Sequence, residues 1–172
     1  ADNLLVVLND ILDFSKIEAG KLNIENIHFN LKEVTSQIMK TQGLRAAERS
    51  IVFEYEFDER IHQALIGDPF RLNQILLNLL SNAIKFTENG TVKLIIKLIK
   101  ETENTNEIKF SVSDTGTGIK PENLDKIFDS FIQQDSSITR KFGGTGLGLS
   151  ITQELVRLFK GTIAVKSKPN IG

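Results

Sequence analysis

The chain has 172 residues, of which 40% are hydrophobic, and its formal net charge of −1 argues against nucleic acid or an anionic membrane as the main partner. It contains no cysteine, which excludes disulfides and thiolate metal sites, and its two histidines, His28 and His62, are too far apart in sequence to suggest a histidine-based metal site. No apolar run approaches the ~20 residues of a membrane span and no signal peptide is visible, so we expect a soluble, cytoplasmic segment, with membrane anchoring of a longer parent protein left open.

The first part of the chain is predicted to be a helix, an extended connector and a second helix. Residues 2–19 carry a broad apolar stripe with helical spacing. Residues 22–29 alternate in a way that is typical of an extended connector. Asn30, with Glu33 three residues later, resembles a capping box and predicts a helix that runs to about residue 47.

The middle of the chain is predicted to contain a strand, a helix and a hairpin. The segment "IVFEYEF" at 51–57 alternates as a strand does. Asp68 followed by Pro69 favours a helix start, and the apolar pattern carries that helix to about residue 86. Two further strands, at 91–99 and 107–113, are joined by a polar stretch, which predicts a β-hairpin.

The last part begins with a short helix expected from Pro121 to about residue 128. Residues 129–146 have no clear period and are rich in Ser, Gln, Thr and Gly, which is typical of a mobile loop. A helix at 147–159 and a last strand at 162–167 follow. Because two strands form a hairpin, we expect the α/β class: a two-layer sandwich whose mixed, mostly antiparallel sheet has helices on one face, preceded by a single N-terminal helix.

The helix predicted over 68–86 carries several amides in an otherwise apolar sequence. Its core-spaced residues are Leu72, Ile75, Leu76, Leu79, Ala83 and Phe86. A polar stripe is formed by residues three or four positions apart: Arg71, Gln74, Asn78, Asn82 and Lys85. One interpretation is a solvated face, although such faces usually carry Glu and Lys. An amide oxygen suits Mg²⁺ and a nearby lysine can bind phosphate, so the stripe favours a metal–phosphate site.

Two glycine-rich segments follow predicted structure elements. "DTGTGI" (114–119) comes directly after a strand, where the glycines allow tight turns and close ligand approach; an ordinary turn is the alternative. "GGTGLGLS" (143–150) leads into an apolar helix, so its backbone N–H groups can form an anion cradle; a flexible hinge is the alternative. Neither segment has the P-loop pattern of a glycine-rich loop ending in Lys and Ser or Thr.

Taken in order, these elements resemble the ATP-binding catalytic domain of sensor histidine kinases. The wider superfamily includes heat-shock-90 chaperones, type II topoisomerases and mismatch-repair ATPases. "NLLSNAIKF" (78–86) is similar to the family's N box, "DTGTGI" to its first glycine box, "IFDSF" (127–131) to its F box and "GGTGLGLS" to its second glycine box. The resemblance covers about residues 22–168. "LNDILDFSKIEAGKL" (8–22) resembles the end of the kinase dimerisation hairpin, which separates histidine kinases from the other branches.

The resemblance implies a role for each matching position. Asn78 corresponds to the Mg²⁺-binding Asn, Asn82 and Lys85 to residues facing the ribose and phosphates, and Asp114 to the Asp that binds adenine. The glycines and phenylalanines of the later boxes correspond to the adenine pocket and the ATP lid. The expected ATP-binding residues are Asn78, Asn82, Lys85, Asp114, Gly116, Gly118, Ile119, Phe131, Gly144, Thr145, Gly146, Leu147 and Gly148.

Two features qualify the resemblance. Gln74 lies four residues before Asn78, where the hydrolases of the superfamily have a general-base Glu, and an amide cannot take a proton from water at neutral pH. The acceptor histidine of the family lies on the first helix of the hairpin, and neither His28 nor His62 is in such a helix. We therefore expect no catalytic residue in this chain: residues 1–21 are the end of the phosphoacceptor hairpin, and 22–172 are the ATP-binding domain with its last strand truncated.

The function implied is an ATP-binding histidine kinase domain that uses ATP and Mg²⁺ and transfers the γ-phosphoryl group to a histidine outside this sequence. The expected partners are the kinase's own dimerisation and phosphoacceptor domain and a response regulator receiver domain, in a parent that is a homodimer. The alternatives are a nucleotide-binding signalling module without kinase activity and an ATPase of the same superfamily.

Overall fold

A computed structural model describes residues 2–129 and 146–172, and the side chains of the first helix from residue 8 onward. The described chain divides into two compact units. One is formed by Ala1–Glu25 with Ile119–Ser167, and the other by Asn26–Gly118 with Lys168–Gly172. No helix in the described part of the chain is long and apolar enough to cross a membrane.

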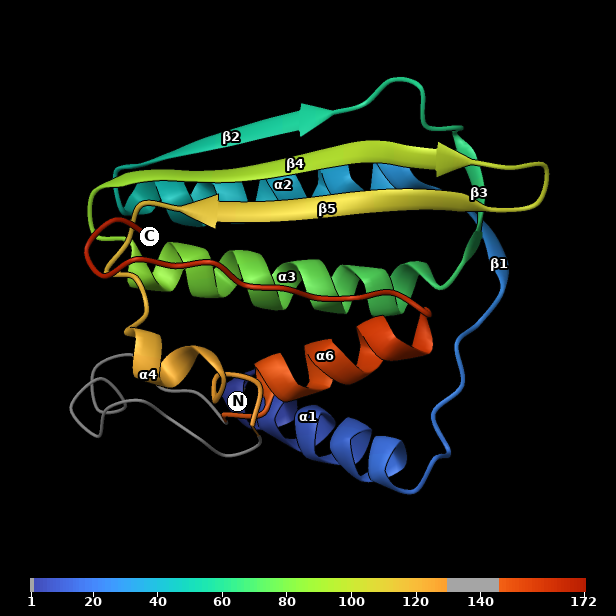
Figure 1. Ribbon diagram of the computed structural model, residues 1–172, viewed down its shortest axis with the longest axis horizontal. Coiled ribbons are helices and arrows are strands. Elements are labelled where there is room, and N and C mark those ends of the chain that lie inside the picture. The colour runs from blue at the N-terminus through green and yellow to red at the C-terminus, as the bar shows by residue number, and fades with distance from the viewer. Residues whose placement is uncertain (1, 130–145) are drawn as a thin grey trace. The chain divides into compact units, whose positions relative to one another are not determined.

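The second unit is built on a three-stranded sheet in the order β2-β4-β5 (Figure 1). Strand β2 (Ile51–Phe57) is parallel to β4 (Gly90–Glu101), which pairs in turn with the antiparallel strand β5 (Asn106–Asp114). The predicted strand at 51–57 and the predicted hairpin are therefore confirmed. Buried side chains alternate with partly buried ones along the first half of β4, as expected for a sheet with one face against a core.

Helices α2 (Leu31–Glu48) and α3 (Pro69–Phe86) pack side by side on one face of this sheet (Figure 1). The Asn30 side chain starts α2 by accepting hydrogen bonds from the backbone N–H groups of Lys32 and Glu33. The Glu33 carboxylate accepts from the Asn30 side-chain amide at 3.2 Å, a variant of the predicted capping box. The mixed sheet with helices on one face confirms the predicted fold class.

The core lies between the sheet and the two helices. Its central residues are Leu31, Ile38, Ala46, Ile51, Ile61, Leu76, Leu80, Ala83, Ile84, Val92, Leu94 and Ile96. The prediction for α3 was wrong at two positions, because Phe86 is 36% exposed and Leu79 is only partly buried. Leu80 and Ile84 are buried instead. Because α3 packs against α2 as well as against the sheet, the buried face of the helix includes these two residues.

A second, two-stranded sheet is formed by the short strands that lead into α2 and α3. Strand β1 (Ile27–Asn30) pairs antiparallel with β3 (Ala64–Gly67), and Ile27 lies opposite Gly67. The sequence predicted only an extended connector over 22–29 and did not indicate β3. Four-residue strands carry too few alternations to be recognised, and their pairing joins residues far apart in the chain.

The first unit contains three described helices. Helix α1 (Asp2–Glu18) contacts α6 (Gly148–Leu158), and α4 (Pro121–Leu124) is shorter than predicted. The strand predicted at 162–167 is absent from the structure. Ile163, Val165 and Ser167 keep the alternating burial of an extended chain, but the segment forms no strand ladder within the described residues. Alternation shows that a chain is extended, whereas a strand also needs a neighbour.

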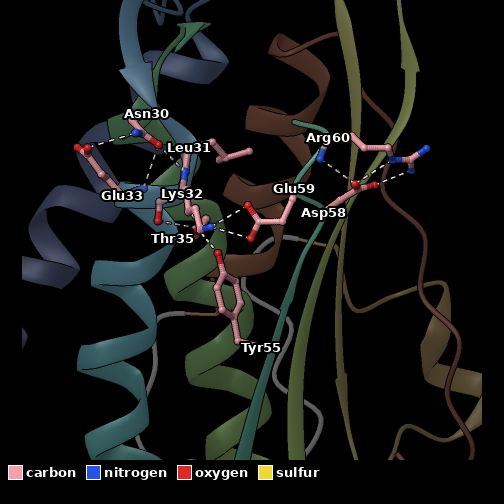
Figure 2. A network of polar contacts seen from close by, with 9 residues as sticks. All are labelled: Asn30, Leu31, Lys32, Glu33, Thr35, Tyr55, Asp58, Glu59 and Arg60. Carbon is pink, nitrogen blue, oxygen red and sulfur yellow. Dashed lines mark hydrogen bonds and ion pairs between the residues drawn. The ribbon is translucent and has the colours of Figure 1, made fainter. Parts of the chain in front are cut away.

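The turn after β2 is attached to β4 through Asp58, which Figure 2 shows together with Arg60. The Asp58 carboxylate accepts from the backbone N–H of Leu98 at 3.2 Å, where β4 has a bulge, so it continues the β2–β4 pairing beyond the end of β2. Arg60 donates to the same carboxylate through Nε and Nη2, at 2.9 and 2.7 Å. Hydrogen bonds from Arg60, and a weaker one from Leu98, hold the pKa of Asp58 well below its usual range.

We predict that Asp58→Asn lowers stability at pH 7 and weakens its acid dependence. A carboxylate whose pKa is depressed by folding stabilises the protein above its unfolded pKa of about 4, and this contribution is lost as the pH falls. Denaturant unfolding at pH 7 and pH 3 should therefore show a gap between wild type and variant that narrows at the lower pH. Glu88→Gln, which removes an exposed carboxylate from the same unit, is the control.

Candidate functional site

The polar stripe of α3 lies beside its buried face. Asp68 caps the helix by accepting from the backbone N–H of Arg71 at 3.0 Å, as the sequence predicted. Arg71 Nη1 donates to Gln74 Oε1 at 2.8 Å. One turn further on, Asn82 Nδ2 lies 3.5 Å from Asn78 Oδ1. All the stripe residues are partly buried, so the stripe is a polar surface with restricted solvent access rather than a fully solvated face.

Lys85 ends this stripe. Its side chain is partly buried, and burial lowers the pKa of its ammonium group. The Nζ atom lies 5.1 Å from the centre of the Phe86 ring. A partly dehydrated ammonium group at the end of an amide stripe is suited to an anionic ligand, because fewer water molecules must be displaced when the anion binds.

Asp114 ends β5 and begins the first glycine turn. Its Oδ1 atom accepts a hydrogen bond from Gly116 N at 2.9 Å. Within the described part of the chain, this is the one hydrogen bond that the carboxylate accepts. The neighbouring strand β4 also holds the turn, because Thr115 N donates to Thr91 O at 3.1 Å. Asp114 is only partly buried, so the carboxylate is held at the strand end with capacity to accept further hydrogen bonds.

The Asp114 turn is joined directly to the end of α3. Thr117 N donates to Phe86 O at 3.2 Å. A Cβ atom added at Gly116 would lie 2.4 Å from the same carbonyl oxygen, so the turn can approach the helix this closely only with glycine. The structure thus brings the end of α3, where Lys85 lies, next to the turn of Asp114, Gly116 and Gly118.

The last residues of the unit support the turn. Gly118 has a φ of +66°, and a Cβ there would lie 2.2 Å from Lys168 O. Asn170 N donates to Thr117 O at 2.8 Å. Residues far from the turn in sequence therefore fix its geometry. No side-chain pattern could indicate this role for residues 168–172, because the contacts involve backbone atoms only.

The remaining predicted site residues belong to the first unit. Ile119 N donates to Ser167 Oγ at 2.8 Å. Gly146 has a φ of +72°, Leu147 is 1% exposed, and Gly148 begins α6. The side chain of Leu147 cannot cap the helix, so the first N–H groups of α6 have no side-chain partner among the described residues. Three predicted site residues lie outside the described residues: Phe131, Gly144 and Thr145.

The donor set of the α3 stripe can be compared with what Mg²⁺ requires. The described residues contain no group of three or more His, Cys, Asp or Glu side chains that could hold a metal ion. Asn78 offers one amide oxygen, whose hydrogen bond from Asn82 is long at 3.5 Å. Mg²⁺ bound together with a polyphosphate usually takes one or two protein ligands and keeps several water molecules, so a single amide oxygen fits this kind of site.

Comparison with known proteins gives a family match. The model of the histidine kinase-, DNA gyrase B- and HSP90-like ATPase family matches residues 67–172. The chain is 44% identical over 98% of its length to hybrid signal transduction histidine kinase K of Dictyostelium discoideum, and 41% identical over its whole length to histidine-protein kinase BarA of Escherichia coli. It spans 14% and 19% of those two relatives.

Solved structures are also similar to this chain. The structure of full-length ShkA in complex with AMPPNP matches 99% of this chain and 34% of that one, with a TM-score of 0.85 and 32% identity. The histidine kinase AdeS of Acinetobacter baumannii matches 98% of this chain and 74% of that one, with a TM-score of 0.76. At 23% identity, the second match concerns the fold alone.

The contact between the turn and α3 predicts that Gly116→Ala is destabilising. The added methyl group would overlap Phe86 O and lie 2.8 Å from Asp114 Oδ1, and such crowding costs about 1–3 kcal/mol. Thermal or denaturant unfolding measures the loss. Gly43→Ala is the matched control, because a Cβ there meets the Phe53 ring at an ordinary 3.5 Å and alanine favours the interior of α2. Equal stability of the two variants would contradict the close contact.

Proposed function

Because this chain belongs to the family of histidine kinase-, DNA gyrase B- and HSP90-like ATPases, we propose that it is the ATP-binding catalytic domain of a sensor histidine kinase. The observation that carries the proposal is the hydrogen bond from Thr117 N to Phe86 O, which joins the Asp114 turn to the end of the helix that carries the amide stripe. The relatives, which are named as histidine kinases, support the kinase branch of the family.

Asp114 is proposed to bind the adenine base. A carboxylate that accepts one N–H from its own turn can accept another from the adenine amino group. Guanine presents a carbonyl oxygen at that position, so two acceptors would face each other and GTP would be disfavoured. The close packing of Gly116 on Phe86 O holds the Asp114 turn against the end of α3, which supports a base site there.

Asn78, Asn82 and Lys85 are proposed to hold the sugar and phosphate end of the nucleotide. The Asn78 amide oxygen would be a ligand of Mg²⁺, which supplies charge neutralisation at the phosphates when bound. Asn82 can donate to the ribose or a phosphate oxygen. The partly buried Lys85 ammonium would contact phosphate, where its low hydration favours the contact. Positioning and electrostatic stabilisation are what phosphoryl transfer requires of the protein.

The predicted residues of the first unit complete the proposal. The N-terminus of α6 and its preceding glycine would bind phosphate oxygens through backbone N–H groups, in line with the missing side-chain cap. The roles of Ile119, Gly146, Leu147 and Gly148 stay predictions. So do those of the residues outside the described part of the chain: Phe131, Gly144 and Thr145.

Gln74 favours phosphoryl transfer over hydrolysis. Its side-chain oxygen accepts from Arg71 at 2.8 Å, and an amide has no basic lone pair to deprotonate water. The domain would thus protect bound ATP until an acceptor histidine arrives. The whole protein's histidine phosphorylation, its dimerisation domain and its response regulator partner are proposals that rest on relatives of which this chain spans a small part.

Labelled ATP tests the function. The purified chain with Mg²⁺ should bind ATP, release free phosphate very slowly and not become phosphorylated. Adding a protein segment that carries the histidine-bearing helices should produce labelled phosphoprotein, since positioning of the acceptor supplies most of the rate. His28→Ala and His62→Ala should change none of these results. Rapid phosphate release by the chain alone would identify an ATPase, and failure to bind ATP would leave a module that binds only a partner.

The adenine role predicts that Asp114→Asn weakens ATP and ADP binding equally. The amide replaces an acceptor with a group that also donates, and mispairing of this kind costs about 1–3 kcal/mol. Isothermal titration with each nucleotide measures the change. Glu107→Gln, at the other end of β5, is the control and should bind normally. A variant that lost ATP but kept ADP would place Asp114 at the phosphates instead.

The metal role predicts that Asn78→Ala weakens ATP binding only when Mg²⁺ is present. Removal of a partly buried surface amide should leave the fold intact, because the helix core lies on other residues. Titration with ATP in Mg²⁺ and in EDTA separates the two effects. Asn73→Ala makes the same change elsewhere on α3 and should be neutral. The same loss of affinity in both buffers would exclude Asn78 as a metal ligand.

A further inference from the structure

The last turn of α3 has four backbone carbonyl groups that no intrahelical N–H group can satisfy. Thr87 satisfies the first of them locally, because its backbone N and its Oγ1 donate to Ala83 O at 3.1 and 2.8 Å. The last, Phe86 O, accepts from Thr117 N of the Asp114 turn. The two carbonyls between them need a partner from another part of the chain.

Arg49 supplies that partner. Its Nη1 atom donates to Ile84 O at 2.6 Å and to Lys85 O at 3.1 Å. Arg49 is also the residue at which α2 ends, since its backbone N–H donates to Ala46 O. The guanidinium is therefore anchored at the end of one helix and caps the end of its neighbour, where a positive charge also complements the helix dipole.

We propose that Arg49 is a positioning residue for the nucleotide site, although it touches no residue assigned to ligand contact except through the Lys85 backbone. This inference rests on the proposed function for its effect on ATP. The carbonyls that Arg49 holds belong to the turn of α3 that carries Lys85. The next carbonyl, Phe86 O, is the acceptor for the Asp114 turn, so the guanidinium holds the helix turn that links Lys85 to the Asp114 turn.

The coupling follows from how closely these groups pack. The last turn of a helix is the part most prone to fray when its carbonyls lose their partners. A shift of Phe86 O removes the acceptor of Thr117 N, and Gly116 packs against the same oxygen so closely that the turn must move with it. Asp114 begins that turn. Loss of the cap would therefore displace both Lys85, the proposed phosphate ligand, and Asp114, the proposed adenine ligand.

The test uses three variants of the chain. Arg49→Met keeps the length of the side chain and removes its charge and donors. Arg49→Lys restores a charged donor that can satisfy one carbonyl. Arg45→Met removes the same charge from the last turn of the same helix, at an exposed position, and is the matched control. For each, titration with ATP and Mg²⁺ is combined with amide hydrogen exchange at Thr117 and, as a reference in the core of α3, at Leu80.

A positioning role predicts that Arg49→Met weakens ATP binding about 3- to 30-fold at a temperature where the variant is folded. Exchange at Thr117 should accelerate while exchange at Leu80 does not, Arg49→Lys should recover part of both losses, and Arg45→Met should resemble wild type. The inference is overturned if Arg49→Met leaves Thr117 exchange unchanged, if both amides accelerate equally, or if Arg45→Met has the same effect. Should the wild-type chain not bind ATP, the proposed function fails, and Thr117 exchange still decides whether Arg49 holds the turn.

Discussion

The structure depends on how α3 is held. Leu76 and Leu80 are completely buried between α2 and the sheet, and burial of two leucines contributes about 3–6 kcal/mol. The amides occupy the neighbouring stripe of the same helix, so the core contacts that stabilise the fold also set the orientation of the polar side chains. Asn78 and Lys85 are therefore carried by a helix that is fixed in the core, and their positions do not depend on a loop.

Backbone hydrogen bonding is the second constraint. The close approach of a helix end to a turn leaves carbonyl and N–H groups at the border of the core, where an unpaired group is costly. Here each of the last carbonyls of α3 has a partner, drawn from Thr87, Arg49 and Thr117. The proposed ligand-binding surface is therefore built on backbone groups whose hydrogen bonds are satisfied.

The local electrostatics agree with a site for a metal-bound polyphosphate. The Lys85 ammonium is partly buried, the Asn78 amide oxygen accepts a hydrogen bond from Asn82 at 3.5 Å, and the Asp114 carboxylate lies at the end of a strand that is distant from them in sequence. In the proposed site, the positive and neutral groups would face the phosphates and the negative group would face the base. The Gln74 amide adds a group that can hydrogen-bond but cannot serve as a base.

The sequence by itself determined the elements whose causes are local. Asn30 and Asp68 cap their helices through residues two or three positions away, and the alternation of β2 and of the hairpin strands is written in adjacent residues. The amide stripe of α3 follows from helical spacing alone. Only the tertiary structure decided the pairing of β1 with β3, the exposure of Phe86, the lack of a ladder at 162–167, and the contacts of Arg49 and Thr117 with the end of α3. These features depend on which groups distant in the chain come into contact, often through backbone atoms that every residue has. No local pattern of side chains could therefore specify them.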